Sequence, residues 1–439
     1  MKIAPILALL AVPLTAAPRA VTYHQDVAPI LAKRCEGCHK QGEIAPMAFT
    51  SYGETRPWAR AIRQAVLKGT MPPWHADAET TARYRNARVL TNEERDVLTS
   101  WAESGAAEGD PVAHPAIAAA TEPSGWRLGK PDMVVRIPGY HVPESGTLQY
   151  TFLVTPTGFT EDTWVEAAEW KIDQRRVVHH INAFVRPPGS SYIASAPPRQ
   201  LYVASTAERA IRKQDEREVD RRELLVGYEP GYRAQPWGEG RAKLIRKGSD
   251  IVFEMHYTAN GKDVTDYSEL GIYFARKAPR ERILTLSPAD NQFVIPPGDS
   301  NYRSFTSATF KRPVQLVSLQ PHMHLRGKAY EIRATYPDGR HETLLNVPRY
   351  DFNWQTTYFL AKPMDLPAGA VLECVAWFDN SPNNRFNPDA AKEVRWGDQS
   401  WEEMNIGFTE IAFDATADPD VATLSGSTRP GSAPVQKRP

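Results

Sequence analysis

Short runs rich in valine, isoleucine, threonine and aromatic residues recur along most of the chain, from Trp126 to about Asp414. Turns rich in glycine, proline and aspartate separate these runs, as at 337–339 and 367–369. Runs of this length and residue type predict β-strands, and their regular spacing is typical of antiparallel sandwiches. The length of the stretch predicts two sandwiches, which we place at residues 124–283 and 284–415.

Between residues 21 and 109 the apolar positions follow helical spacing instead. Residues 25–33 predict a short helix, and residues 58–68 have helical spacing with one apolar side. Thr91 with Glu94 three residues later forms a capping box that predicts the start of a third helix. The expected fold class is therefore multidomain: a small all-α domain followed by two antiparallel β-sandwich domains.

Four further segments differ in composition. Residues 1–17 combine one lysine, an apolar run from Ile3 to Leu14 and small residues after it, which is typical of a cleaved signal peptide. Residues 110–123 are rich in alanine and proline and predict a linker, while residues 416–439 lose apolar content and predict a disordered tail. The charged stretch 205–225 is most simply a solvated surface helix or mobile insertion, and the alternative is a lid or a docking element.

The balance of charge and the lack of long apolar runs limit the partners that we expect for this protein. The 52 basic side chains balance the 52 acidic ones, so the chain has no excess of positive charge for nucleic acid or for an anionic membrane surface. No apolar run is long enough to span a bilayer. We therefore expect a periplasmic or secreted protein with small or neutral partners, no nucleic acid and no membrane span.

Cys35, Cys38 and His39 form a C-x-x-C-H motif. In the c-type haem attachment signal the two thiols form thioethers with the haem vinyl groups, and the adjoining imidazole binds the iron. A redox C-x-x-C pair or half of a zinc site is the alternative, but the adjoining histidine, the expected export and the lack of a second C-x-x-C favour haem. With its three helices, this part resembles a small class I cytochrome c domain at residues 21–109, carrying one covalently bound haem c.

That resemblance implies a sixth iron ligand from the loop between the second and last helices. Met71 lies in this loop and is our prediction, because a methionine ligand raises the haem potential. Met47 and His75 are the rivals. For each of the three, the alternative is an ordinary core or surface residue.

Histidines gather in the strand-rich part of the chain. His322 and His324 flank Met323 at the end of a β-branched run, and residues two apart on a strand point to the same face, so both imidazoles can meet one metal ion. His179 and His180 are adjacent, and they can share an ion only at a bulge or a strand end. His256 and Met404 lie on other predicted strands. Two imidazoles with a thioether select copper, particularly Cu(I).

The order of these motifs resembles the type II copper monooxygenases, the family of peptidylglycine α-hydroxylating monooxygenase and dopamine β-monooxygenase. The resemblance rests on the motifs His179-His180, His256-Tyr257, His322-Met323-His324 and Glu403-Met404, and it covers about residues 126–414. It implies two jelly-roll-like sandwiches that face each other across an open cleft. The whole chain looks like a bacterial form of this unit, fused to an N-terminal cytochrome c domain.

The resemblance also implies two copper ions with different roles. His179, His180 and His256 would hold an electron-transfer copper, while His322, His324 and Met404 would hold the copper that reacts with dioxygen and hydroxylates a C–H bond of a small organic substrate. Two electrons are needed per turnover, and we expect an external donor to deliver them through the haem. The alternative is a copper and haem protein that only transfers electrons or binds copper, without oxygenase activity.

Three positions depart from the amidating members of the family. Those enzymes have an arginine two residues before the first histidine of His-x-His, and an asparagine and a tyrosine after the methionine, all of which contact a peptide terminus. Here Gln320, Ile406 and Phe408 stand in those places. Because the bidentate anchor for a carboxylate is lost, we expect a less polar or uncharged substrate rather than a peptide.

Overall fold

The computed structural model describes residues 19–111, 125–205, 208, 223–229 and 234–426. The predicted signal peptide lies outside these residues, as do most of the predicted linker, most of the charged insertion 205–225 and the end of the tail. Within the described part of the chain, no helix has the length and apolar character needed to cross a membrane.

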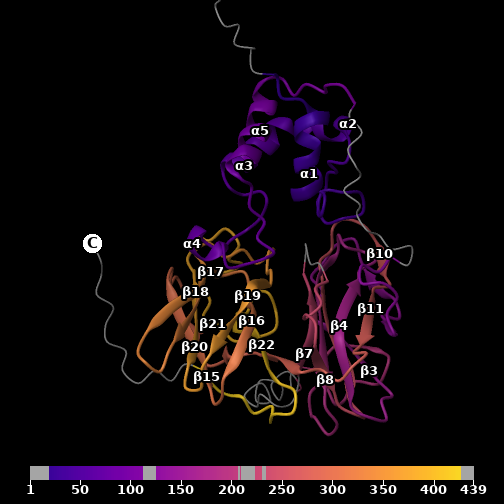
Figure 1. Cartoon of the computed structure of the whole chain (residues 1–439), viewed down its shortest axis with the longest axis vertical. Helices are drawn as coiled ribbons and strands as arrows, with labels where there is room; N and C mark the ends of the chain where they lie inside the picture. The colour runs from indigo at the N-terminus through magenta and orange to yellow at the C-terminus, as the bar shows by residue number, and fades with distance from the viewer. Residues whose placement is uncertain (1–18, 112–124, 206–207, 209–222, 230–233, 427–439) are drawn as a thin grey trace, which may run out of the picture.

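In the described part of the chain, all helices lie within residues 23–103 (Figure 1). They are α1 (Ala28–Arg34), α2 (Tyr52–Thr55), α3 (Ala59–Leu67), α4 (Ala78–Thr81) and α5 (Asn92–Glu103), together with a π-helical turn at Tyr23–Val27 and a 3-10 turn at Arg56–Trp58. The predicted capping box starts α5: the Glu94 amide donates to the Thr91 hydroxyl and the Thr91 amide donates to the Glu94 carboxylate. Leu31, Leu98 and Trp101 form the centre of a small core between α1, α3 and α5.

The expected small all-α cytochrome c domain is wrong. The helices are short pieces joined by long turns, and residues 74–87 leave them to pack on the β-sheets. Tyr84 forms a β-bridge with Leu360 and its buried hydroxyl donates to the Leu344 carbonyl at 2.7 Å. Because this segment contributes Ala76 and Tyr84 to the core of the C-terminal β-half, the N-terminal part does not close on itself, and most of the protein is β-sheet.

One long sheet runs through the whole β-region. In spatial order its strands are β1 (Met133–Arg136), β11 (Glu269–Phe274), β4 (Thr163–Lys171), β8 (Arg241–Ile245), β12 (Glu281–Leu286), β22 (Asn405–Asp414), β16 (Val314–His322) and β19 (Tyr358–Leu366), with β13 (Ala289–Asp290) also paired to β22.

Two five-stranded sheets pack against the two ends of this long sheet. The first contains β6 (Leu201–Tyr202), β3 (Thr151–Pro156), β9 (Asp250–Tyr257), β5 (Val178–Arg186) and β7 (Glu223–Tyr228). The second contains β18 (His341–Val347), β17 (Gly327–Thr335), β20 (Val371–Phe378), β15 (Tyr302–Phe310) and β23 (Ala422–Gly426). Two small pairs complete the fold: β2 (Tyr140–Val142) with β10 (Val264–Asp266), and β14 (Val294–Ile295) with β21 (Val394–Arg395).

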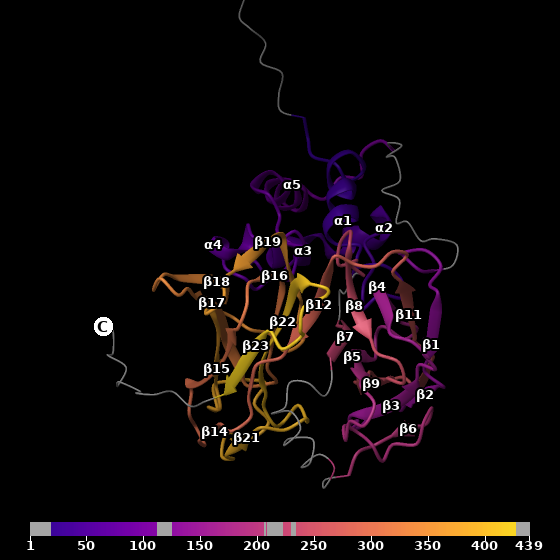
Figure 2. The ribbon, with the colours of Figure 1, turned by 60° about the horizontal axis from the view of Figure 1, so that its bottom comes forward.

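The expectation of two separate antiparallel sandwiches is also wrong. The expected boundary at 283/284 falls inside β12, which pairs antiparallel with β22 on one side and parallel with β8 on the other. The long sheet therefore continues from one half into the other (Figure 2). Each half still has its own core between two layers, and Val317 and Ala412 of the C-terminal half belong to the core of the N-terminal half.

We placed the start of the disordered tail, residue 416, too early in the chain. β23 pairs with β15 over residues 422–426, and Val421 is buried. The strand is short and rich in small polar residues, so its composition predicts disorder, but its main-chain hydrogen bonds complete the edge of the sheet.

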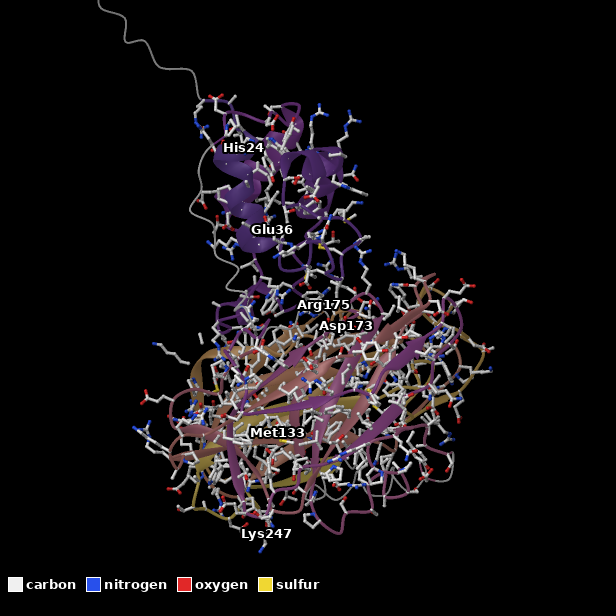
Figure 3. The ribbon with its side chains drawn as sticks, turned by 90° about the vertical axis from the view of Figure 1, so that its right-hand side faces the viewer. His24, Glu36, Met133, Asp173, Arg175 and Lys247 are labelled. Carbon is white, nitrogen blue, oxygen red and sulfur yellow. The ribbon has the colours of Figure 1, made fainter. Side chains whose placement is uncertain are left out.

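The helical part stands at one end of the β-region and contacts both halves (Figure 3). Toward the N-terminal half, the Arg175 guanidinium lies 3.5 Å from a Glu43 carboxylate oxygen. Toward the C-terminal half, the Asn346 amide donates to the Asp77 carboxylate at 2.7 Å. These contacts place the C-x-x-C-H motif against the β-sheets.

Candidate metal centre

Three histidines meet where β5 and β9 lie side by side. His180 is directly opposite His256, and the register shifts between Val178 and His180, so His179 sits in a bulge. This is the irregularity that two adjacent histidines need in order to face one point. One nitrogen from each of the three rings lies within 4.8 Å of the others, and the Nδ1 atoms of His179 and His180 are 3.1 Å apart.

The chemistry of this trio fits a metal ion. Within the described part of the chain, the buried His179 Nε2 and His256 Nδ1 have no hydrogen-bond partner, although an unsatisfied buried polar atom costs about 1–3 kcal/mol. Burial and, as a second cause, the His322 imidazole lower the pKa of His179 to about 4. Burial lowers the pKa of His256 to about 3, with His179 as a second cause. The rings are therefore neutral near pH 7 and have lone pairs available to a cation.

His322 and His324 converge in the same way at the end of β16. Their ring centroids are 5.2 Å apart and the rings are perpendicular, while Met323 turns away into the core and is fully buried. His322 Nδ1 donates to the Gln355 side-chain oxygen at 2.5 Å, and His324 Nδ1 donates to the Glu402 carbonyl at 3.2 Å. These bonds leave each Nε2 with its lone pair, and the buried His324 Nε2 has no partner among the described residues.

Glu403 ties this histidine turn to the segment that carries Met404. One of its carboxylate oxygens accepts the His324 amide at 2.8 Å, and the other accepts the Arg326 amide at 2.5 Å. Glu403 is fully buried, and burial raises the pKa of its carboxyl to about 8 although these main-chain donors lower it. Met404 follows directly and is 6% exposed, and the bonds of Glu402 and Glu403 bring the start of this segment to His324.

The two histidine groups share the lining of one small pocket instead of facing each other across an open cleft. His179, His180 and His322 line a space of about 20 Å³, roughly one water molecule in size. Phe352 closes it: the ring stacks on His179 with centroids 4.6 Å apart and meets His324 edge-on at 5.9 Å. The expected open cleft is wrong because a loop of the C-terminal half inserts this ring between the two groups.

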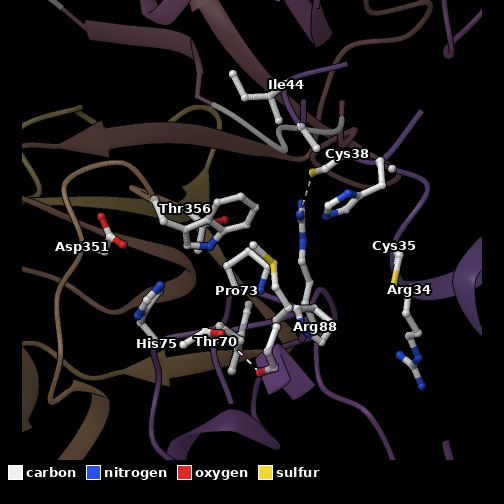
Figure 4. Close-up of a pocket in the computed structure, with 18 of the residues that line it drawn as sticks. Arg34, Cys35, Cys38, Ile44, Thr70, Pro73, His75, Arg88, Asp351 and Thr356 are labelled. Atoms are coloured by element: carbon white, nitrogen blue, oxygen red, sulfur yellow. Dashed lines mark hydrogen bonds between the residues drawn. The ribbon is translucent and has the colours of Figure 1, made fainter. Parts of the chain in front are cut away.

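A second, much larger cavity contains the C-x-x-C-H motif. It has a volume of about 1050 Å³ and is lined by Cys35, Cys38 and His39 on one side, and by loop residues 349–357 of the C-terminal β-half on the other. Figure 4 shows Arg88 extended across it toward Cys38, with the Arg88 Nη1 atom 3.9 Å from the Cys38 sulfur.

The donor set and the walls of this cavity fit a covalently bound haem. His39 stacks on Phe49 with ring centroids 4.3 Å apart, and its Nδ1 donates to the Met47 carbonyl at 3.2 Å, which directs Nε2 toward a metal. Burial lowers the pKa of His39 and raises the pKa of the Cys35 thiol to about 12. Arginines in the lining of the same cavity suit the carboxylates of a porphyrin, and there are five of them: Arg34, Arg85, Arg88, Arg349 and Arg385.

All three candidates for the sixth ligand line this cavity. Met71 is 44% exposed. The Met47 carbonyl accepts a hydrogen bond from the ring of His39, so residue 47 lies on the same side of the cavity as His39. His75 points toward Asp351 (Figure 4), and burial lowers its pKa while Asp351 raises it. The choice of Met71 stays a prediction.

Sequence reasoning missed the residues that hold these groups in place. Glu403 had a signal, since an acid beside a candidate ligand is a common partner of metal-binding residues. Gln355, Phe352 and Arg88 lie in loops without periodicity, so nothing in the sequence connected them to the histidines or to the cysteines.

Comparisons with known proteins add no family. No family model matches the chain, and no curated protein matches it. Similar solved structures include the major capsid protein P2 from bacteriophage PM2, at 9% identity over 66% of this chain and 97% of that chain with a TM-score of 0.20. The VP2 subviral particle of infectious bursal disease virus matches at 8% identity over 67% and 76%, with a TM-score of 0.18. The N-terminal CBM22 tandem domain of Paenibacillus barcinonensis Xyn10C matches at 10% identity over 60% and 83%, with a TM-score of 0.12. Scores this low carry no argument about fold or function, so the function rests on the side chains of the site.

Proposed function

We propose that the protein is an exported copper-dependent monooxygenase that uses O2 to hydroxylate a C–H bond of a small organic substrate. The observation that carries the proposal is the set of buried, neutral imidazoles in two neighbouring groups, with nitrogens that have no hydrogen-bond partner in the described part of the chain and can bind a cation. No hydrogen bond from the described part of the chain satisfies the three nitrogens at His179, His256 and His324.

Each histidine group would hold one copper ion. His179, His180 and His256 offer nitrogen ligands only, which suits an ion that cycles between Cu(I) and Cu(II). His322 and His324 offer two nitrogens, and Met404 would add a soft sulfur that favours Cu(I). Copper bound to the second group supplies the dioxygen chemistry, which no side chain can perform.

Neighbouring residues orient the imidazoles of His322 and His324 for metal binding. Gln355 and Glu402 hold the Nδ1–H groups of His322 and His324, so that Nε2 of each ring is the ligand atom. Burial keeps both rings neutral, because it lowers the pKa of each imidazole. Glu403 anchors the main chain at His324 and so keeps the two imidazoles in one arrangement.

Electrons would come from a c-type haem attached to Cys35 and Cys38, with His39 as the iron ligand. An external donor would reduce this haem. Cys35, Cys38 and His39 line the same cavity as residues of the β-half that carries His322, which supports a donor group close to the copper sites.

The substrate is proposed to be uncharged and weakly polar. Gln320 and Phe408 line the histidine pocket, and the Gln320 amide is already engaged because it donates to the Gln355 carbonyl at 3.0 Å. Among the described residues, none that lines this pocket is an arginine or a lysine. A peptide carboxylate would find no cationic partner there.

Copper loading tests the proposal. The haem-loaded protein reconstituted with Cu(I) should bind two copper ions per haem, and the reduced form should bind carbon monoxide at one of them. Substrate-dependent oxygen uptake should follow. A reduced, fully loaded protein that binds no carbon monoxide would contradict oxygenase function.

One observation favours the alternative, a copper and haem protein that only transfers electrons. The histidine pocket holds about 20 Å³, which is too small for any organic substrate. An oxygenase therefore requires Phe352 or its loop to move when substrate binds, whereas an electron-transfer protein does not. Carbon monoxide binding separates the two functions, since electron transfer needs no open ligand position.

A further inference from the structure

Residues 349–357, the loop between β18 and β19, lie between the histidine pocket and the cysteine cavity, together with Glu229, which lines both. Asp351, Trp354 and Thr356 line the cysteine cavity, whereas Phe352 and Gln355 line the histidine pocket. Asn353 lines both. The loop is therefore a thin wall with one face toward each site.

Its histidine face makes several direct contacts. Phe352 stacks on His179 at 4.6 Å between centroids, and Gln355 bonds to His322. The Gln355 amide donates back to the Phe352 carbonyl at 3.0 Å, which couples the two residues. At its start, the Tyr350 hydroxyl donates to the Met323 carbonyl at 2.8 Å and accepts the Met323 amide at 3.0 Å.

On the face toward the cysteine cavity, the loop contacts Arg88, which in turn contacts Cys38. The Arg88 guanidinium lies over the Trp354 ring, 4.8 Å from its centroid, and the same side chain reaches the Cys38 sulfur. The Trp354 amide donates to the Asp351 carbonyl at 2.9 Å, so a tight turn holds the ring in this position. Two peptide units separate Trp354 from Phe352.

We propose that this loop is the electron bridge between the two sites, with Phe352 as the residue that couples it to His179 and Trp354 as the residue that faces the cysteine cavity. The inference rests on the proposed function, because it requires haem at Cys38 and copper at His179. The transferred species is one electron: iron goes from Fe(II) to Fe(III) and copper from Cu(II) to Cu(I), so no bond forms or breaks and no proton moves. Phe352 and Trp354 are positioning residues, since neither is expected to bind a metal.

The test is anaerobic rapid mixing of the haem-loaded, copper-loaded protein with a one-electron reductant of the haem. Haem reoxidation is followed by its absorbance, and Cu(II) loss is followed by electron paramagnetic resonance. Phe352→Leu should slow haem reoxidation by about tenfold or more, equivalent to 1.4 kcal/mol in the barrier. Phe352→Tyr keeps the ring and should restore the rate. Both variants should keep the copper content and the haem spectrum of the unaltered protein.

A matched control removes an aromatic ring elsewhere. Phe159→Leu breaks an edge-to-face pair with Phe274, 5.7 Å between centroids, in the N-terminal β-half, and it should leave haem reoxidation unchanged. Equal rates for Phe352→Leu and the unaltered protein would overturn the bridge while leaving the oxygenase proposal intact. An unaltered protein that takes up no copper would overturn both, and the copper content reveals which case applies.

Discussion

Removing the Glu403 carboxylate should damage the fold and one metal group together. Glu403→Ala takes away the acceptor of two buried main-chain donors, the amides of His324 and Arg326. A buried donor left without an acceptor costs about 1–3 kcal/mol, so the two should lower the free energy of unfolding by about 2–6 kcal/mol. Glu403→Gln keeps one carbonyl oxygen but places its NH2 group against the other amide, and it should lose about half as much.

Urea unfolding of the copper-free protein measures this loss. Glu393→Ala is the matched control, because Glu393 is an exposed acid whose ion pair with Arg395 spans 2.7 Å, and exposed pairs contribute about 0–1 kcal/mol. Copper titration adds a second readout: Glu403→Ala should lose uptake at the group of His322 and retain it at the group of His179. If the free energy of unfolding falls by less than about 1 kcal/mol and both copper sites stay intact, Glu403 does not anchor the main chain at His324 as we assign it.

Three further outcomes are expected. The pKa of His179 is about 4 in the folded protein against 6.5 unperturbed, so between these pH values the unfolded chain binds one more proton, and the stability of the copper-free protein rises with pH. Urea unfolding at several pH values should show that His179→Gln reduces this slope by about 1.4 kcal/mol per pH unit. An unchanged slope would contradict the buried neutral ring. Met404→Ile should leave the fold and the His179 copper intact while oxygen uptake is abolished, so retained turnover would contradict the role of Met404. His39→Ala should remove the normal haem spectrum but allow turnover with an artificial reductant, and a normal spectrum would exclude His39 as the iron ligand.

The histidine trio shows what local sequence rules can predict. Alternation along a strand sends adjacent side chains to opposite faces, so His179 and His180 could converge only at an irregularity. The bulge before His180 is that irregularity. The capping box at Thr91 is another local feature, since its two hydrogen bonds lie within four residues. Both predictions depended on neighbours in the sequence alone.

The arrangement of the whole chain depended on contacts that no local rule contains. The expected domain boundary lies within residues 281–286, and nothing in these residues says that they form a strand that pairs with β8 and β22 and so joins the two halves. Tyr84 looks like part of a helical region, yet its hydroxyl bonds to Leu344, 260 positions away. Phe352 lies in a loop, and its contact with His179 crosses from one half of the protein to the other.

Because β12 is shared, neither half of the β-region can be excised as an independent unit. A cut at 283/284 would divide this strand and leave the edges of β8 and β22 open, and unpaired edges of that kind promote aggregation. Insertions and shuffled segments should therefore be tolerated in surface turns, while any exchange of one half for a foreign domain would have to carry its own replacement for the central strand.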